Sequence, residues 1–280
     1  MRRLVIRPGA IGDVILSLPA LESLCADYTE FWVPEPVTPL VRLGDAVRSI
    51  GSTGLDLLEI FAGQAPPPLL EALRSFDDII SWYGSNREQF RSVVRAMGLP
   101  FHHLRALPPD GARHAIDYYL AQVQPFALSL VEPAPIIDCP AAAGGCVVIH
   151  PFSGSRLKNW PLERFQELAR RLPAEFEVFW CAGPEEELPE ARRFDNLYDL
   201  ACWLAGARLY IGNDSGITHL AAAVGAPVVA IFGPTDPRVW APRGSRVKVV
   251  AAALAGGPVE SVSLDRVALA ADELLSLPRR

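Results

Sequence analysis

The fold is decided by one stretch of the chain, residues 209–237, which reads LYIGNDSGITHLAAAVGAPVVAIFGPTDP. Two apolar runs, Leu209 to Gly212 and Val228 to Phe232, flank a small-residue segment of helical character from Ile217 to Val224. A strand, a polar turn, a helix and a second strand in this order form a βαβ unit, which builds parallel sheets. The turn at residues 213–216 therefore follows a strand and begins a helix. The free N–H groups and the dipole of the helix's first turn favour an anion there, such as a phosphate.

Chain length and composition bound the class of protein. The 280 residues are 50% hydrophobic and 21% charged, which suits two domains of about 100–150 residues with sizeable cores. The formal charge is −6; residues 1–140 hold 11 Lys and Arg against 16 Asp and Glu, and residues 141–280 hold 15 against 16. Nucleic acid is not expected as a partner, because phosphate backbones require a basic protein face.

The cysteines and the N-terminus indicate a soluble cytoplasmic protein. Arg7 and Asp13 interrupt the apolar N-terminal stretch, so it lacks the core of a signal peptide, and no run reaches the length of a membrane span. The odd number of cysteines and the lack of C-x-x-C spacing favour reduced thiols. The five cysteines are Cys25, Cys139, Cys146, Cys181 and Cys202.

A proline-rich stretch predicts a boundary between two domains. Residues 132–145 contain three prolines and end in a glycine pair, which makes a poor helix or strand and a good linker. We predict an N-terminal domain over residues 1–140 and a C-terminal domain over residues 146–280. Strands alternate with helices in both, so the predicted fold class is α/β with parallel sheets. The predicted strands, besides those of the opening stretch, are Leu4–Arg7, Phe31–Val33, Ile79–Trp82, Cys146–His150 and Glu177–Ala182. The predicted helices outside that stretch are Val14–Ala26, Arg87–Met97, Trp160–Leu172, Leu197–Ala205 and Leu264–Leu277.

The turn after the first predicted strand places a carboxylate at the start of a helix. Residues 7–13 read RPGAIGD, which is not the G-x-G-x-x-G of a dinucleotide site, so a nicotinamide dehydrogenase is disfavoured. Asp13 has two interpretations. It is either a plain helix cap, or a general base held at the carboxyl end of a strand and facing a cleft between domains.

A second polar loop, residues 150–161, reads HPFSGSRLKNWP and connects a strand to a helix. Ser153, Gly154, Ser155 and Lys158 are candidates to cradle an anion there. The chain has only two lysines beside 24 arginines, and Lys158 is one of them. A lysine in such a chain suggests that this position requires a compact ammonium group rather than a guanidinium. The simpler interpretation is a solvated surface lysine. Trp160 is expected to pack under the following helix.

In the turn of the opening stretch, Asp214 is either the cap of the following helix or a ligand of sugar hydroxyls. In the second case the N–H groups of Ser215, Gly216 and Ile217 face a phosphate. His219 lies one helical turn after Ser215 and so points back toward the same site. Its simpler interpretation is a packing residue.

These motifs together resemble those of glycosyltransferase family 9, the ADP-heptose:lipopolysaccharide heptosyltransferases and their relatives. The similarity is strong over residues 1–22 and about 146–245, and weak between 30 and 140. Four motifs carry it: Gly12-Asp13-Val14-Ile15-Leu16 with Pro19, the loop from Ser153 to Pro161 ending in KNWP, the run GNDSGxxHLAAA from Gly212 to Ala223, and FGPTDP from Phe232 to Pro237.

The resemblance implies a GT-B architecture, in which two Rossmann-like domains with parallel sheets face a cleft. The second domain would bind a nucleotide-sugar donor, the first an acceptor, and the last helix would return to the first domain. Transfer would invert the anomeric centre without a metal or cofactor, and the chain indeed lacks the D-x-D triplet of metal-dependent transferases. The donor would be an ADP-heptose-like sugar, and the acceptor a lipopolysaccharide core or a related surface glycan. Because such an acceptor is assembled at the inner membrane, the resemblance also implies a cytoplasmic protein that can contact the cytoplasmic face of that membrane.

The resemblance also implies roles for individual residues. Asp13 would be the general base that deprotonates the acceptor hydroxyl. A glutamate near the ribose would fall within residues 185–187, with Glu186 as the candidate. The residues expected to bind the donor are Ser153, Gly154, Lys158, Glu186, Asp214, Ser215, Gly216 and His219.

Departures from the family pattern leave alternatives open. The first domain is short, residues 79–86 depart from the family's usual charged segment, and the net charge of residues 1–140 sits poorly with a phosphorylated acceptor. A local basic groove could still form from arginines of this domain. These are Arg42, Arg48, Arg74, Arg87, Arg91, Arg95, Arg105 and Arg113. The alternatives are a nucleotide-sugar epimerase or hydrolase on the same scaffold, or a degenerate, non-catalytic nucleotide-sugar-binding protein.

Overall fold

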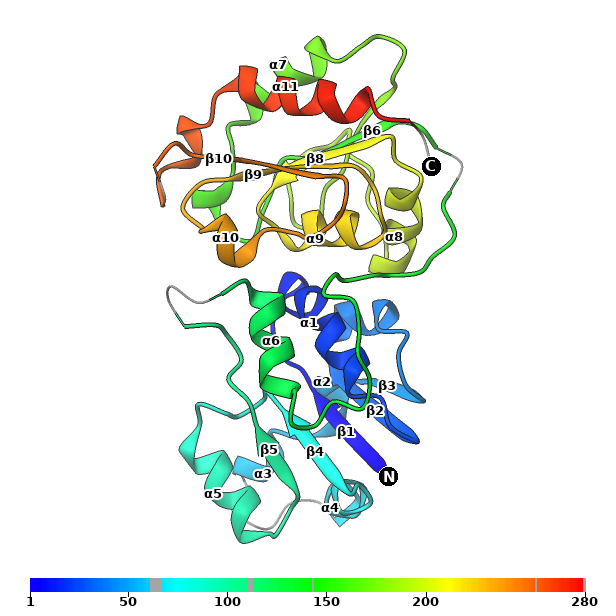
Figure 1. The fold of residues 1–280 in the computed structure, drawn as a ribbon, viewed down its shortest axis with the longest axis vertical. Helices are drawn as coiled ribbons and strands as arrows, with labels where there is room; N and C mark the ends of the chain where they lie inside the picture. The colour runs from blue at the N-terminus through cyan, green and yellow to red at the C-terminus, as the bar shows by residue number, and fades with distance from the viewer. Residues whose placement is uncertain (61–66, 110–112, 143, 255, 279–280) are drawn as a thin grey trace. The chain divides into compact units, whose positions relative to one another are not determined.

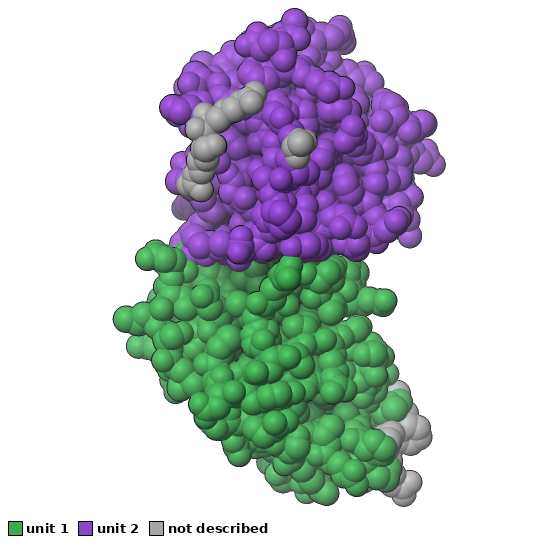
Figure 2. Space-filling view, turned by 90° about the vertical axis from the view of Figure 1, so that its right-hand side faces the viewer, with its two compact units in different colours: residues 1–133 green, residues 134–280 purple. Residues whose placement is uncertain are grey.

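The computed structural model describes residues 1–60, 67–109, 113–142, 144–254 and 256–278. The chain divides into two compact units, Met1–Pro133 and Ala134–Arg280 (Figure 2). The division falls inside the proline-rich stretch 132–145. Each unit is built on a five-stranded parallel sheet, so the predicted α/β fold class with two parallel sheets is confirmed. In the described part of the chain, no helix is long and apolar enough to cross a membrane.

The first unit has the strand order β3-β2-β1-β4-β5 (Figure 1). The helices α1 and α6 lie side by side on one face of this sheet. The opposite face is covered by α3, α4 and α5, whose apolar side chains pack with Leu4 and Ile6 of β1. The strands are β1 (Arg2–Ile6), β2 (Tyr28–Val33), β3 (Ala46–Ser49), β4 (Asp78–Ser81) and β5 (Phe101–His103). The helices are α1 (Ile11–Ser23), η1 (Glu35–Leu40), α2 (Ile50–Thr53), α3 (Leu57–Ile60), α4 (Pro67–Arg74), α5 (Glu88–Ala96) and α6 (Ala115–Val123).

The second unit has the strand order β10-β9-β8-β6-β7. In Figure 1, α7 and α11 cover one face of its sheet and α8 and α9 the other. The strands are β6 (Val147–His150), β7 (Val178–Trp180), β8 (Leu209–Asn213), β9 (Val228–Phe232) and β10 (Val247–Ala251). The helices are η2 (Arg156–Lys158), α7 (Leu162–Arg171), α8 (Leu197–Ala205), α9 (Gly216–Ala223), α10 (Pro237–Trp240), η3 (Val259–Ser261) and α11 (Leu264–Leu275).

The central strands β6, β8 and β9 are buried at every residue, as expected for parallel strands that are covered by helices on both faces. The helix α7 packs through Phe165 and Leu168. Trp160 lies beneath this helix, and its ring meets the Phe165 ring edge-on with 4.9 Å between the ring centroids. The Trp160 indole Nε1–H donates to the carbonyl of Val262. The expectation that Trp160 packs under the helix is therefore confirmed.

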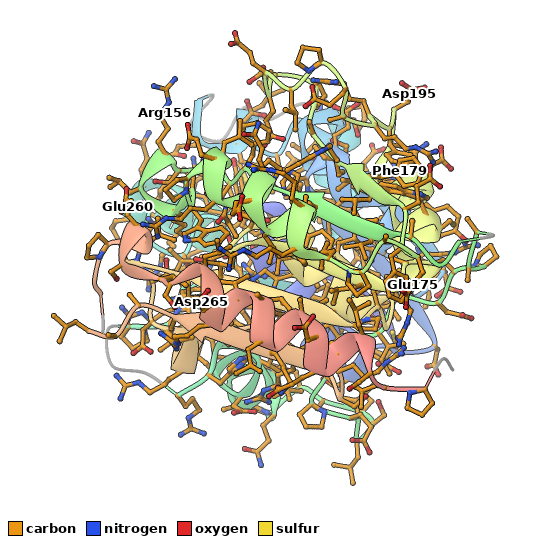
Figure 3. The ribbon with its side chains drawn as sticks, turned by 90° about the horizontal axis from the view of Figure 1, so that it is seen from above. Arg156, Glu175, Phe179, Asp195, Glu260 and Asp265 are labelled. Carbon is orange, nitrogen blue, oxygen red and sulfur yellow. The ribbon has the colours of Figure 1, made fainter. Side chains whose placement is uncertain are left out.

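The helix α11 packs against the sheet of its own unit. The resemblance implied instead that the last helix returns to the first domain. Its residues Val267, Ala271 and Leu274 belong to the core of the second unit. Figure 3 shows α11 running beside α7 over this sheet. The Arg171 guanidinium of α7 donates to the Asp265 carboxylate of α11 at 2.9 Å.

Candidate functional site

Both sheets have a point where consecutive strands diverge to opposite sides, and such switch points are where open parallel sheets bind ligands, beyond the carboxyl ends of the strands. In the second unit this point lies between β6 and β8, which pair in register from Val147–Leu209 to His150–Gly212. The loop 151–161 follows β6, and the turn 214–215 follows β8. In the first unit it lies between β1 and β4, and Asp13 follows β1. The candidate residues of each unit thus lie at its switch point, except Glu186, which follows the neighbouring strand β7.

An ion pair joins the loop after β6 to the turn after β8. The Lys158 Nζ donates to Asp214 Oδ2 at 2.7 Å, and the Asp214 side chain is only 6% exposed. A carboxylate buried to this degree requires a partner, and the lysine supplies it. Lys158 is therefore held at the start of α9 rather than solvated as a surface lysine would be.

The start of α9 offers main-chain donors. Its cap is Ser215, whose Oγ accepts from the Thr218 N–H at 3.3 Å and pairs with Thr218 Oγ1 at 3.1 Å. The interpretation of Asp214 as the cap is therefore wrong, because Asp214 turns to Lys158 instead. Within the described residues, the N–H groups of Gly216 and Ile217 donate to no other part of the chain. Two free donors, a helix dipole and an ammonium group make this a favourable place for a phosphate.

Glu186 is the glutamate of residues 185–187 that the fold positions. Its Oε2 accepts from the Gly183 N–H at 2.6 Å and lies 3.1 Å from Nε2 of His150, the last residue of β6. Burial acts to raise the pKa of the Glu186 carboxyl, but the hydrogen bonds from His150 and Gly183 outweigh it and hold this pKa below its ordinary value. Glu185 and Glu187 are exposed. A carboxylate acceptor with one fixed oxygen therefore lies after the neighbouring strand β7.

His150 has a defined tautomer by this contact. A carboxylate only accepts, so the imidazole nitrogen that faces Glu186 carries the proton. The other nitrogen, Nδ1, has no hydrogen-bond partner among the described residues, and the side chain is 3% exposed. The sequence analysis did not select His150; its position as the last residue of a strand before a polar loop was the available signal.

The remaining candidates of the second unit lie in the same two segments. The Ser153 hydroxyl donates to the Ser155 carbonyl at 2.8 Å and accepts from the Ser155 N–H at 3.3 Å, so it shapes its own loop. A Cβ at Gly154 would meet nothing within 4 Å, which leaves this backbone open to a ligand. His219 is the fourth residue of α9, and it is 6% exposed.

In the first unit, Asp13 lies in the first turn of α1 and closes that turn. Its Oδ2 accepts from the Ala10 N–H at 2.9 Å. The cap residue is Ala10, and Asp13 lies three residues further on, so the interpretation of Asp13 as the cap itself is wrong. Gly9 has φ +128, and a Cβ there would lie 2.9 Å from the Asp13 Cβ. Glycine at this position therefore lets the carboxylate fold back onto the turn.

A buried guanidinium supports the Asp13 turn from beneath, and sequence analysis did not identify it. Arg7 is fully buried and donates to the carbonyls of Pro8 and Asp13, both at 2.9 Å, and to Ser17 Oγ at 3.0 Å. Burial lowers the pKa of Arg7, although the nearby Asp13 charge opposes this. One side chain thus ties together the start of the turn and the first turns of α1.

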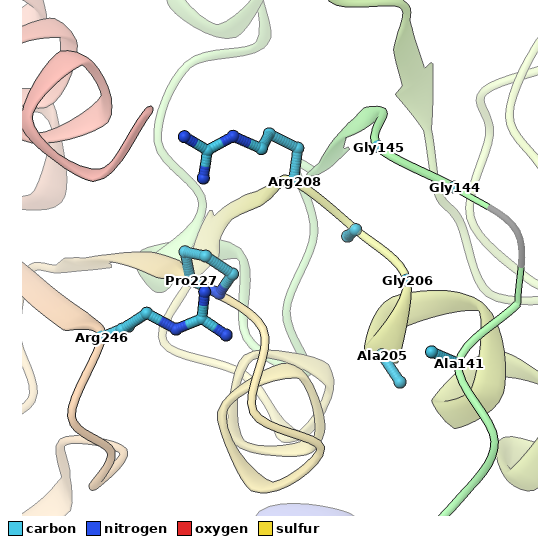
Figure 4. Close-up of a pocket in the computed structure, with 9 residues that line it drawn as sticks. Ala141, Gly144, Gly145, Ala205, Gly206, Arg208, Pro227 and Arg246 are labelled. Atoms are coloured by element: carbon cyan, nitrogen blue, oxygen red, sulfur yellow. The ribbon is translucent and has the colours of Figure 1, made fainter. Parts of the chain in front are cut away.

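Two other features of the described structure do not belong to the site. A cavity of about 230 Å³ lies at the amino ends of the strands of the second sheet, whereas the candidate residues follow the carboxyl ends. Its lining includes Arg208, Pro227 and Arg246, which directly precede β8, β9 and β10 (Figure 4). Arg208 there donates to the carbonyls of Leu275 and Leu277, which ends α11. In the first unit, several of the arginines considered for a basic groove pair with carboxylates, among them Arg48 with Glu30, Arg87 with Glu59 and Arg91 with Glu88. No group of three or more His, Cys, Asp or Glu in the described ranges is arranged to hold a metal ion.

Comparisons with known proteins point to one family. The sequence model of the protein family described as Glycosyltransferase family 9 (heptosyltransferase) matches residues 110–261 of this chain. Lipopolysaccharide heptosyltransferase 1 of Escherichia coli (strain K12) is 31% identical over 117 residues, which cover 36% of this chain and 36% of that protein. The chain thus spans about a third of this relative's length.

Solved structures agree over nearly the whole chain. The glycosyl transferase family 9 protein from Veillonella parvula DSM 2008 aligns with a TM-score of 0.74 at 19% identity, over 98% of this chain and 97% of that one. The E. coli ADP-heptose lps heptosyltransferase II aligns with a TM-score of 0.73 at 18% identity, over 98% of both chains. At these identities the likeness shows a common fold.

Proposed function

Because the chain belongs to glycosyltransferase family 9, we propose that it is an inverting, metal-independent transferase that moves a sugar from a nucleotide diphosphate to a glycan acceptor. The donor is ADP-heptose-like, and the acceptor is a lipopolysaccharide core or related surface glycan, met at the cytoplasmic face of the inner membrane. The observation that carries this proposal is the position of Lys158. Its ammonium group lies at the start of α9, at the switch point of the second sheet, paired with a nearly buried carboxylate.

Departure of a nucleoside diphosphate leaves negative charge on its phosphate oxygens, and fixed donors aimed at that charge lower the barrier. In this proposal Lys158 and the N–H groups of Gly216 and Ile217 supply them. Asp214 holds the Lys158 ammonium in place before the donor binds. Once the ammonium pairs with the phosphate of the donor, the Asp214 carboxylate accepts hydrogen bonds from the sugar hydroxyls.

Glu186 supplies the contact with the ribose. Since Gly183 and His150 both bind its Oε2, Oε1 is the oxygen that can accept from a ribose hydroxyl. This geometry supports the choice of Glu186 over its exposed neighbours.

Asp13 acts as the general base. One carboxylate oxygen is used by the Ala10 N–H, and the other can accept the proton of the attacking acceptor hydroxyl. Inversion requires the base and the leaving-group donors to act on opposite faces of the sugar, and the proposal assigns the base to Asp13 and the leaving-group donors to Lys158 and the start of α9.

The test is a calorimetric titration with ADP, UDP and GDP, in EDTA and then with Mg²⁺, on the wild type and two lysine variants. We expect selective ADP binding without metal. Lys158→Ala should weaken it by about tenfold or more, because a charge-assisted contact is lost and Asp214 is left unpaired beside the phosphate. Lys248→Ala is the matched control, since this partly exposed lysine lies on the edge strand β10 and pairs with Glu273 of α11.

The variant Lys158→Ala/Asp214→Asn separates the two effects, because it removes the lysine without leaving a bare carboxylate. Equal ADP affinity for the wild type and Lys158→Ala would refute the assignment of Lys158. Preference for UDP or GDP would retain the transferase and exclude the ADP-linked donor.

A further inference from the structure

The last residue of β8 connects to both ends of the loop that carries Lys158. Asn213 is fully buried. Its Nδ2 donates to the carbonyl of Pro151 at 2.8 Å, and its Oδ1 accepts from the N–H of Trp160 at 3.0 Å. Pro151 directly follows β6 and Trp160 lies just before α7, so these two bonds enclose the segment 152–159.

No strand pairing reaches this segment. The register between β6 and β8 ends at the His150–Gly212 pair, one residue before the loop begins. Within the segment, the hydrogen bonds of Ser153 and of η2 are local. Among the hydrogen bonds and ion pairs of the described residues, those of the Asn213 amide and of the Lys158–Asp214 pair therefore tie the loop to β8 and its turn.

Asn213 is also bonded toward the start of α9. Its main-chain carbonyl accepts from Thr218 Oγ1, and Thr218 Oγ1 in turn lies 3.1 Å from Ser215 Oγ, the cap of α9. One residue thus fixes the loop with its side chain and the helix start with its backbone. These are the two segments that supply donors to the proposed phosphate site.

We propose that Asn213 is the positioning residue of the phosphate-binding loop, which holds Lys158 at the start of α9 in the empty enzyme. The inference rests on the proposed function for its ligand, a nucleoside diphosphate. An amide suits the role because it offers a donor to Pro151 and an acceptor to Trp160 in one flat group. A carboxylate retains only the acceptor, and leucine, of similar size, retains neither.

Order in the loop is tested by hydrogen exchange, read by mass spectrometry on the full chain without ligand. The variants are Asn213→Leu and Asn213→Asp, with Val250→Ala on β10 as a control for destabilisation of the same core away from the loop. We expect Asn213→Leu to accelerate exchange across 152–160 by about tenfold, as for loss of two buried hydrogen bonds. Asn213→Asp should retain more protection at the Trp160 amide, and Val250→Ala should leave the loop unchanged.

Positioning is separated from a general structural role by donor kinetics and ADP titration. A structural defect lowers the fraction of active protein and leaves the KM of the remainder unchanged. Loss of positioning instead raises the donor KM and the ADP Kd, with Asn213→Leu affected more than Asn213→Asp and Val250→Ala affected in neither.

Two results would overturn the inference. One is wild-type exchange of residues 152–160 in Asn213→Leu; the other is an unchanged ADP Kd when loop exchange does accelerate. A wild-type chain that binds none of ADP, UDP and GDP defeats the proposed function instead, and the exchange data alone then decide whether Asn213 orders the loop. Should Asn213→Leu fail to fold, Asn213→Asp against Val250→Ala gives the same comparison.

Discussion

At the scale of single residues, Asp13 combines an observed contact that closes the first turn of α1 with the role of general base that we propose for it. Asp13→Asn keeps an oxygen for the Ala10 N–H, so α1 should remain capped, but an amide cannot take a proton from the acceptor. We expect transfer to fall by at least about 10³-fold, with ADP affinity and the unfolding midpoint nearly unchanged. Turnover like that of the wild type in a donor-consumption assay would remove Asp13 from the role of base.

Glu186 gives a pH dependence whose sign follows from its lowered pKa. A carboxyl with a folded-state pKa below its unfolded value stabilises the fold when ionised. This stabilisation is complete above the unfolded pKa, about 4.3, and is lost as the pH falls toward the folded value. The free energy of unfolding of wild type should therefore exceed that of Glu186→Gln at pH 7, and the difference should shrink below about pH 4.3.

The control for this measurement is Glu185→Gln, because Glu185 is exposed and next but one to Gly183. Denaturant titrations at pH 7, 5, 4 and 3 provide the comparison. A difference between wild type and Glu186→Gln that stays constant with pH, or one that Glu185→Gln reproduces, would contradict the fixed carboxylate.

At the scale of elements, the caps of α9 and α11 are chemically alike and should differ in function. Ser215 and Ser263 each accept from a main-chain N–H three residues on, at 3.3 Å. Ser215→Ala and Ser263→Ala should each cost about 1 kcal/mol of stability. Only Ser215→Ala should also weaken ADP binding, because α9 begins at the proposed phosphate site. Equal ADP affinity of the two variants would show that the start of α9 is not used.

The elements that sequence analysis predicted are those with long or wholly buried apolar patterns. The helix Leu197–Ala205 and the strand Val228–Phe232 were predicted to the residue. The strands β3, β5 and β10 were missed, since β3 and β5 have only four and three residues, and none of the three shows a clean apolar run. All three lie at sheet edges, where a strand is half covered and the signal is weaker. The edge strand β7 was predicted nevertheless, because residues 178–182 form an apolar run.

The site was predictable where a motif marks it and obscure where tertiary contacts make it. Lys158 and Asp214 could be selected as candidates, yet their pairing across 56 residues of sequence is a property of the fold. His150 and Asn213 act through hydrogen bonds to segments 36 and 53 residues away, which no local pattern connects. Arg7 bonds mainly within its own turn and helix, but its burial is a property of the fold. Ser215 replaced Asp214 as the cap because Lys158 offers the carboxylate a partner, which sequence spacing does not reveal.

At the scale of the whole molecule, the candidate residues of the two units lie on separate cores. The proposed assignment of the nucleotide to the second unit can therefore be tested by ligand linkage. ADP that binds the folded second unit stabilises it by about 2.7 kcal/mol at 100 times its Kd. We expect hydrogen exchange with ADP to slow in peptides from β6, α7 and α9, while peptides from β1 and β2 change little. Lys158→Ala, studied at the same ADP concentration, should lose most of this protection. Protection confined to the first unit would place the nucleotide at Asp13's switch point instead and reverse the assignment of donor and acceptor units.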